Sequence, residues 1–328
     1  MRFEYLIIII YKTISSSKSR KRPRLDQNAN PELENTTNIC YFNSLLQCLY
    51  NSQSFFDFIT KEKNKDSNGV TSNMRKVITY MSKAKEPIDM FSQLKNILYN
   101  LKKSDADNML TQQDVSELFV FIIDKMFDET RIIGNLDKEN FLQSIYTTKI
   151  IALFYSHFYC RITCQKCQKC QNFNNRDEIR NIFYVEKAKS VQAAIDESTL
   201  TSENIKKDCE KCKISCLHKK ESQINYQSQI ITICIKIYNN NLQKINDKIF
   251  IEEKIVLSGT NFTLVGFIEH RGNFLSSGHY IAYASKNGTL VRFNDSSNKE
   301  LKKEQKESIL KKGYTFMLFY EKIQNTSK

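Results

Sequence analysis

Apolar residues recur at three- and four-residue spacing through most of the first half of the chain. This is the period of a helix with one buried face, and it predicts helices over residues 41–50, 55–59, 74–81, 90–101 and 115–127. Polar stretches such as residues 61–69 join these segments. The pattern therefore predicts a helical lobe in the N-terminal part of the chain.

A different pattern begins after Ile145, where short runs rich in Ile, Phe, Tyr and Thr alternate with polar segments. These runs predict strands over residues 179–185, 229–238, 263–269, 279–284 and 289–293. A helical lobe followed by a sheet lobe gives an α+β class, and we expect a cleft where the two lobes meet.

The composition is ordinary for a globular protein, with 41% hydrophobic and 26% charged residues in a chain of 328. Ten cysteines in a chain of this length, without a convincing signal peptide, indicate a reduced intracellular protein rather than a secreted disulfide framework. The apolar run Leu6–Ile10 is too short to span a bilayer, so we expect no membrane contact.

The net charge of +13 is partly concentrated in residues 18–24, within a basic and flexible arm predicted over residues 1–30. Such a cluster is typical of a nuclear import signal, of a contact with an acidic partner, or of a solvated tail. We expect a nuclear or cytoplasmic protein, with the nucleus slightly favoured by this cluster. Direct nucleic-acid binding is not expected, because the arm has no interleaved aromatic residues and the other lysines are diffuse.

Cys40 stands at the start of the first predicted helix. Unpaired N–H groups and the dipole of a helix N-terminus favour a thiolate there, which is the reactive form of cysteine. A cysteine in an apolar helix is more often a small buried residue, and Cys48 and Cys234 are interpreted in that way. Cys40 differs from them because the chain supplies the other parts of a nucleophilic site.

His279 is the candidate base that takes the thiol proton and later returns it to the leaving amine. Asn294 would accept a hydrogen bond from the other ring nitrogen and fix the tautomer, and the adjacent Asp295 is a rival for this role. Asn35, five residues before Cys40, can donate to an oxyanion together with the Cys40 backbone N–H. These residue types predict a cysteine hydrolase.

Two cysteine pairs, Cys164-x-x-Cys167 and Cys209-x-x-Cys212, have the spacing of zinc knuckles. Two such pairs complete one tetrahedral site, and four thiolates leave no position open for a catalytic water, so we expect a structural Zn²⁺. The spacing alone leaves the register open, since Cys160, Cys170 and Cys216 lie close by. His218 is a minor alternative ligand, its other interpretation being a surface histidine.

Four segments in order resemble the ubiquitin-specific protease family of cysteine deubiquitinases. Residues 112–119 look like its Gln-Gln-Asp helix, residues 262–283 its histidine box, and residues 314–320 its closing strand. The segment around Cys40 resembles the family's cysteine box and keeps Leu33, Asn35, Asn38, Cys40, Tyr41, Asn43, Ser44 and Gln47. The resemblance covers about residues 31–322.

The resemblance implies a papain-like fold in a catalytic domain over residues 31–324. Its parts would be a helical thumb (about 31–145), zinc-binding β fingers (about 155–235) and a β-sheet palm (mainly 236–322). It also implies that Cys164, Cys167, Cys209 and Cys212 are the zinc ligands.

The reaction that the resemblance implies is hydrolysis of the isopeptide or peptide bond at the C-terminal glycine of ubiquitin, through a thioester on Cys40. The partners would be ubiquitin and ubiquitylated proteins. Thr37 replaces a family glycine and Ile39 a family threonine. Because glycine often marks a positive φ, Thr37 is expected to strain the loop before Cys40. These departures leave a ubiquitin-binding scaffold with weak or no catalysis as the alternative.

Overall fold

The computed structural model describes residues 27, 30–62, 68–101, 114–130, 148–172, 178–186, 188–199, 201–239, 244–245, 248–274, 277–286, 288–311 and 314–323. The arm predicted over residues 1–30 falls almost wholly outside these described residues, and so does its basic cluster. No helix in the described ranges is long and apolar enough to cross a membrane.

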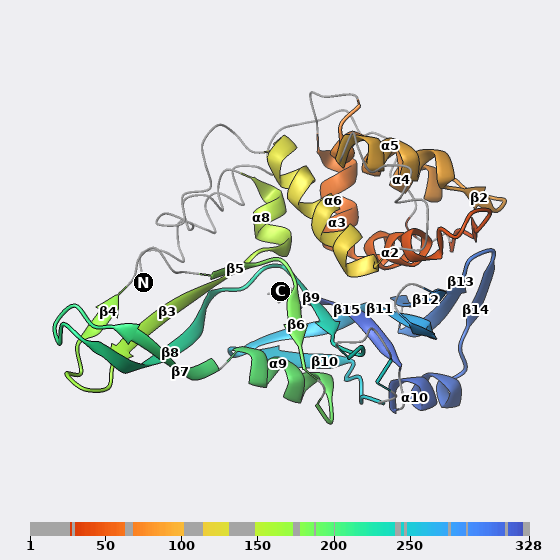
Figure 1. Cartoon of the computed structure of the whole chain (residues 1–328). Helices are drawn as coiled ribbons and strands as arrows, with labels where there is room; N and C mark the ends of the chain where they lie inside the picture. Colours follow the sequence, from red (N-terminus) through yellow and green to blue (C-terminus); the bar gives the residue numbers. More distant parts are fainter. Residues whose placement is uncertain are drawn as a thin grey trace, which may run out of the picture.

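Most of the helices form one lobe, at the top of Figure 1. They are α2 (Cys40–Asn51), α3 (Gln53–Lys61), α4 (Val70–Met81), α5 (Phe91–Leu101), α6 (Val115–Thr130) and α8 (Lys149–Phe154). A short parallel pair, β1 (Leu33–Glu34) with β2 (Ile88–Asp89), closes one end of this lobe. The five predicted helices are confirmed, with ends that differ by a few residues.

The larger sheet has eight strands in the order β14-β13-β12-β11-β15-β9-β6, with β10 paired to β11. Its strands are β6 (Phe183–Val185), β9 (Ile230–Ile235), β10 (Lys254–Leu257), β11 (Thr260–Phe274), β12 (Ser277–Lys286), β13 (Thr289–Asn294), β14 (Ser297–Glu300) and β15 (Thr315–Lys322). All contacts between neighbours are antiparallel except β6 with β9. The predicted C-terminal strands are confirmed.

A smaller five-stranded sheet extends to one side of the molecule (Figure 1). It contains β3 (Ser156–Cys164), β4 (Cys170–Asn172), β5 (Glu178–Arg180), β7 (Thr201–Asp208) and β8 (Ser215–Tyr226). Residues 155–235, the segment predicted as fingers, thus supply this sheet and also give β6 and β9 to the larger one. The mixture of one helical lobe and two sheets confirms the expected α+β class.

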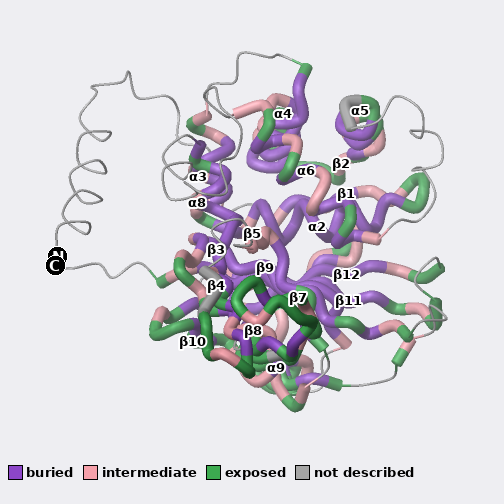
Figure 2. The backbone as a smooth tube through the Cα atoms, turned by 60° about the vertical axis from the view of Figure 1, so that its left-hand side comes forward, coloured by how far each residue is buried: buried purple, intermediate pink, exposed green. Residues whose placement is uncertain are grey.

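Helix α2 lies between the helical lobe and the larger sheet, and it is therefore buried along almost its whole length (Figure 2). It packs on β11 and β12, where Gly266 allows the close approach. A Cβ at Gly266 would lie 2.5 Å from the backbone oxygen of Tyr283 and 3.3 Å from the sulfur of Cys48. Cys48 and Cys234 are both buried, as predicted.

Helices α9 (Val191–Thr199) and α10 (Lys303–Lys311) lie below the larger sheet in Figure 1. The hydrophobic pattern did not predict either of them. In α10 a single residue, Leu310, is buried, so the helix has too little apolar surface to show the period.

Candidate active site and metal centre

Cys40 is the first residue of α2 and is only 3% exposed. Its thiol contacts the backbone N–H groups of Tyr41 and Tyr280. Burial raises the pKa of the Cys40 thiol, and the negative charge of Asp295 adds to this effect, whereas the N–H groups oppose it. The predicted place of Cys40 at a helix start is confirmed.

His279 lies near Cys40 although the two residues are far apart in the sequence. It directly precedes Tyr280 on β12, and the backbone N–H of Tyr280 faces the Cys40 thiol. Its Nε2 lies 2.7 Å from Oδ1 of Asn294 and 3.6 Å from Oδ2 of Asp295. An amide oxygen can only accept, so Nε2 carries the proton in the neutral ring and Nδ1 has a free lone pair. The described residues show no hydrogen bond between His279 and the Cys40 thiol.

Asp295 organises the loop before Cys40. Its carboxylate accepts hydrogen bonds from Nδ2 of Asn35 at 3.1 Å and from Nδ2 of Asn43 at 3.0 Å. Its backbone oxygen accepts from the N–H of Leu33 at 3.3 Å. The sequence identified Asn43 only as part of the family motif, although a polar residue in the first turn of a helix rich in Leu and Phe is itself a signal. In the structure this residue is buried.

Asn35 is held at both ends of its amide. Its Oδ1 accepts from the N–H of Ile39 at 2.8 Å, and its Nδ2 donates to Asp295. One N–H of the amide is thereby used, and the part of the chain that the structure describes shows no acceptor for the second. The structure thus brings together all five residues predicted for the catalytic site.

The expectation of strain at Thr37 is wrong. The residue with positive φ in this loop is Asn38, at +59°, while Thr37 is exposed outside the left-handed region. Asparagine tolerates this conformation better than most residues, because its short side chain causes little clash. Replacement of the family glycine by Thr37 therefore places no strained residue before Cys40.

A second histidine, His270 on β11, is buried beneath the hairpin that carries His279. A Cβ at Gly278 would lie 2.6 Å from its Nε2, so glycine is needed immediately before His279. Its Nδ1 meets the hydroxyl of Tyr238. Burial, with the nearby Lys244 charge, lowers the pKa of His270 to about 4, so the ring is neutral at physiological pH.

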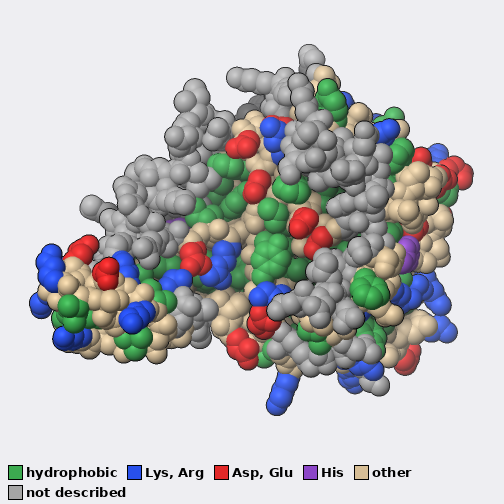
Figure 3. All heavy atoms as spheres, in the orientation of Figure 1, with side chains coloured by type: hydrophobic (Ala, Val, Ile, Leu, Met, Phe, Trp, Pro, Cys, Tyr) green, Lys and Arg blue, Asp and Glu red, His purple; other side chains and the backbone are tan. Residues whose placement is uncertain are grey.

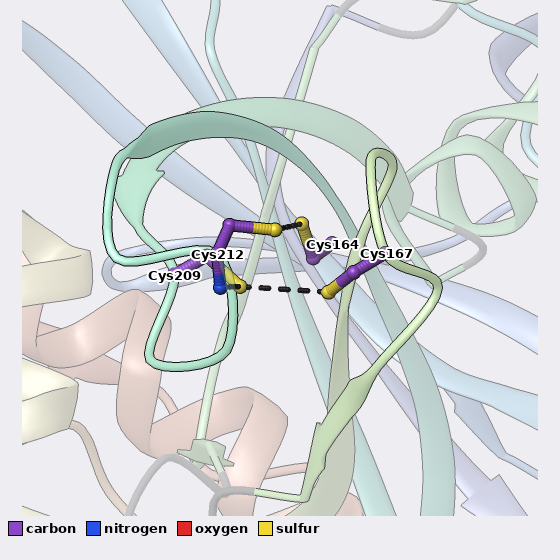
Figure 4. Close-up of side chains that lie close together, drawn as sticks. All are labelled: Cys164, Cys167, Cys209 and Cys212. Carbon is purple, nitrogen blue, oxygen red and sulfur yellow. Dashed lines mark hydrogen bonds between the residues drawn. The ribbon is translucent and has the colours of Figure 1, made fainter.

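The four sulfurs of Cys164, Cys167, Cys209 and Cys212 lie within 4.8 Å of one another at the end of the smaller sheet (Figure 4). The Cys164–Cys212 and Cys167–Cys209 separations are 3.9 and 3.6 Å. Zn–S bonds of about 2.3 Å in a tetrahedron place the sulfurs about 3.8 Å apart. The group could therefore hold a metal ion.

The two pairs sit on matching knuckles. The residues that follow them, Gln168 and Lys213, both have a φ of +56°. Their N–H groups donate to the backbone oxygens of Cys164 and Cys209, at 2.9 and 2.8 Å. The same turn thus presents each pair of thiols.

The other candidate ligands are not members of this group of four. Cys160 contacts the hydroxyl of Ser222, and Cys216 packs beside the four sulfurs without joining them. His218 is fully buried, so its interpretation as a surface residue is wrong; its Nδ1 faces the backbone oxygen of Cys216. The side chain of Cys170 lies outside the described residues.

Comparison with known proteins agrees with this geometry. The family model described as ubiquitin carboxyl-terminal hydrolase matches residues 32–320. Among solved structures, the SAGA DUB module of Ubp8, Sgf11, Sus1 and Sgf73 bound to monoubiquitin contains a chain that is similar with a TM-score of 0.69 and 18% identity. The match covers 98% of this chain and 75% of that one. No curated protein sequence gives a significant match.

Proposed function

Because the chain belongs to the ubiquitin carboxyl-terminal hydrolase family, we propose that it hydrolyses the bond after the C-terminal glycine of ubiquitin with Cys40 as nucleophile. Family membership makes the chain a cysteine-type ubiquitin hydrolase, and the assignment of roles to residues is our proposal. The observation that carries it is the 2.7 Å contact between His279 and Asn294, next to a cysteine at a helix start.

In the first half of the reaction, Nδ1 of His279 takes the proton of the Cys40 thiol, and the thiolate attacks the carbonyl carbon of the glycine. The imidazolium then donates that proton to the departing lysine or α-amine nitrogen as the C–N bond breaks. A thioester between Cys40 and the ubiquitin C-terminus remains. Asn294 holds the ring so that Nδ1 faces the thiol during both transfers.

In the second half, His279 accepts a proton from water, and the resulting hydroxide attacks the thioester. Breakage of the C–S bond releases the ubiquitin carboxylate and restores the thiol with the proton from His279. The Cys40 backbone N–H and the free N–H of Asn35 would stabilise the oxyanion in both halves. Asp295 contributes by holding the Asn35 amide in place.

The four-cysteine group is proposed to hold one Zn²⁺ as a structural ion. Its donors are all thiolates, which suit zinc, and their spacing fits a tetrahedron. When bound, the ion would cross-link the turn between β3 and β4 to the turn between β7 and β8, and Cys40 takes no part in this site.

Ubiquitin binding is supported by the ubiquitin-bound state of the similar Ubp8 module. Hydrophobic and acidic side chains gather on the face between the smaller sheet and the helical lobe (Figure 3). We propose that the folded body of ubiquitin rests on this face while its C-terminal tail reaches Cys40. Ubiquitylated proteins would then be the substrates.

Residues 18–24 are proposed to direct nuclear import and to contribute nothing to turnover. Deletion of this segment should leave hydrolysis of a ubiquitin substrate unchanged and should move the protein to the cytoplasm. A deletion variant that stays nuclear would defeat this assignment.

The proposed nucleophile is tested with a ubiquitin probe that carries a thiol-reactive group at its C-terminus. Cys40→Ala should abolish labelling and leave the affinity for ubiquitin intact. Cys48→Ala is the matched control, because it removes another thiol from the same helix and should keep labelling. Labelling of Cys40→Ala at the normal rate would move the chemistry to another cysteine.

A further inference from the structure

A cavity of about 680 Å³ lies between the larger sheet and α10, on the side of the sheet that faces away from α2. Four of its lining residues, Phe267, Tyr283, Arg292 and Lys299, are direct cross-strand partners on β11, β12, β13 and β14. Their neighbour Gly266 faces Cys48 of α2. Since successive residues of a strand point to opposite faces, this row points to the α10 side.

One part of the cavity wall is electrically neutral, because it contains an internal ion pair between Glu269 and Arg271. The Glu269 carboxylate accepts from Nε and Nη2 of Arg271, both at 3.1 Å, and from the hydroxyl of Tyr283 at 2.9 Å. Arg271 therefore has its counter-ion within the protein. These groups leave no charge over for a ligand.

The rest of the wall carries uncompensated positive charge. Arg292 and Lys299 lie directly opposite each other on β13 and β14, an arrangement of like charges that disfavours pairing of the strands. The Nε atom of Arg292 is buried and has no hydrogen-bond partner among the described residues. Lys248 lines the same cavity.

The one other carboxylate on the wall, Glu304 of α10, forms no ion pair with these cations in the described part of the chain. Three cations against this one free carboxylate leave two positive charges. Figure 3 shows Lys and Arg side chains gathered at the right-hand edge of the molecule, where Figure 1 places β14 and α10.

We propose that this cavity binds the phosphate group of a small phosphomonoester. A phosphomonoester carries close to two negative charges and three strong acceptor oxygens, which matches the excess charge and the number of cationic groups. Arginine is the side chain best suited to several phosphate oxygens at once. The volume is that of sites for small molecules, and Gln305 and Ser308 on α10 offer further polar contacts.

The binding is tested by calorimetry on the full chain with inorganic phosphate, adenosine monophosphate and adenosine as probes. We expect both phosphates to bind and adenosine not to bind. Arg292→Gln should weaken binding of adenosine monophosphate about tenfold or more, since it removes charged hydrogen bonds. Lys303→Gln is the matched control, because it removes one positive charge from α10 outside the cavity and should change affinity by less than about twofold.

A second variant distinguishes a loss of phosphate binding from a folding defect in the sheet. Ser308→Glu introduces a carboxylate into the cavity from an exposed position of α10, so it should abolish phosphate binding while the melting temperature is retained. Absence of binding by either phosphate, equal binding of adenosine, or equal losses in Arg292→Gln and Lys303→Gln would overturn the proposal. Because calorimetry requires no turnover, these outcomes are independent of the activity of Cys40.

Discussion

Two adjacent residues, Asn294 and Asp295, have different partners in the structure. Asn294 lies in hydrogen-bond contact with His279, whereas Asp295 is 0.9 Å farther from the same nitrogen and bonds to Asn35 and Asn43. The positive φ of Asp295, +51°, turns its side chain back toward the loop before Cys40. Asn294 is thus placed to orient the base, and Asp295 to position the oxyanion loop.

Removal of Asn294 should therefore affect the proton transfer. We expect Asn294→Ala to lower kcat by at least about a hundredfold. Without the hydrogen bond from Nε2 to Asn294, the His279 ring can adopt the tautomer with the proton on Nδ1, which cannot accept the thiol proton. Asn294→Asp should recover most of the activity, since a carboxylate can accept the same hydrogen bond. The measurement is kcat on ubiquitin with a fluorogenic C-terminal amide. Full turnover in Asn294→Ala, with collapse in Asp295→Ala, would exchange the two roles.

The buried thiol gives a second prediction at this scale. Burial raises the pKa of Cys40, so without substrate the thiol stays protonated above its ordinary pKa and its alkylation should be slow at neutral pH. The rate should rise as pH increases through the raised pKa. Asp295→Asn removes a charge that opposes the thiolate and should shift this pH profile downward. Alkylation by iodoacetamide, followed by mass spectrometry of Cys40, measures the profile; an upward or absent shift in Asp295→Asn would contradict this account.

The chemical groups of the site could be predicted from the sequence, because a thiol at a helix start and a histidine between Gly278 and Tyr280 are local signals. The link from Asp295 to Asn35 could not be predicted, since it joins residues 260 positions apart. Such contacts depend on how the turn after β13 meets the loop before α2. For the same reason, the sequence could not decide between Asn294 and Asp295.

At the scale of elements, hydrophobic period predicted the structure where one face of an element is buried. Helices α3, α4 and α6 have such faces. Helix α2 is an exception, because it is buried on nearly every side while its Leu and Phe residues still fall at helical spacing. The strands β7 and β8 were missed because they are rich in Lys, Glu, Ser and Asn. Their pairing is fixed by the ladder with β3 and by the knuckles at their ends rather than by a large core.

The knuckles should therefore depend on metal. Cys209→Ser should lose the bound zinc and unfold the end of the smaller sheet, because metal binding in such sites is expressed as folding free energy. Ubiquitin capture should weaken, seen as a raised KM, with any loss of kcat secondary. Elemental analysis and steady-state kinetics measure the two effects. Cys160→Ser and Cys216→Ser are controls that should keep one zinc per chain; metal-free wild-type protein with full activity would refute the site.

At the scale of the whole molecule, the helical lobe and the larger sheet meet at several places, and two of these contacts fix the position of α2. Helix α2 packs on β11 and β12 and carries Cys40 to His279. The second junction is Glu321 on β15, the last strand, which bonds to the start of α3. Because α3 follows α2 after a single residue, Ser52, this junction also fixes the far end of the helix that carries the nucleophile.

The Glu321 junction should contribute measurably to the stability of the whole domain. Its carboxylate accepts from the hydroxyl of Ser52 and from the N–H of Ser54, both at 2.9 Å, at a helix N-terminus where negative charge is favoured. Glu321→Ala leaves these donors without a partner in a site that is only 9% exposed, and should lower the free energy of unfolding by about 1–3 kcal/mol. Urea denaturation followed by circular dichroism measures this change. Glu307→Ala, on an exposed position of α10, should change stability by less than about 0.5 kcal/mol. Equal stability of Glu321→Ala and the wild type would show that the Glu321 junction contributes nothing measurable to holding the two lobes together.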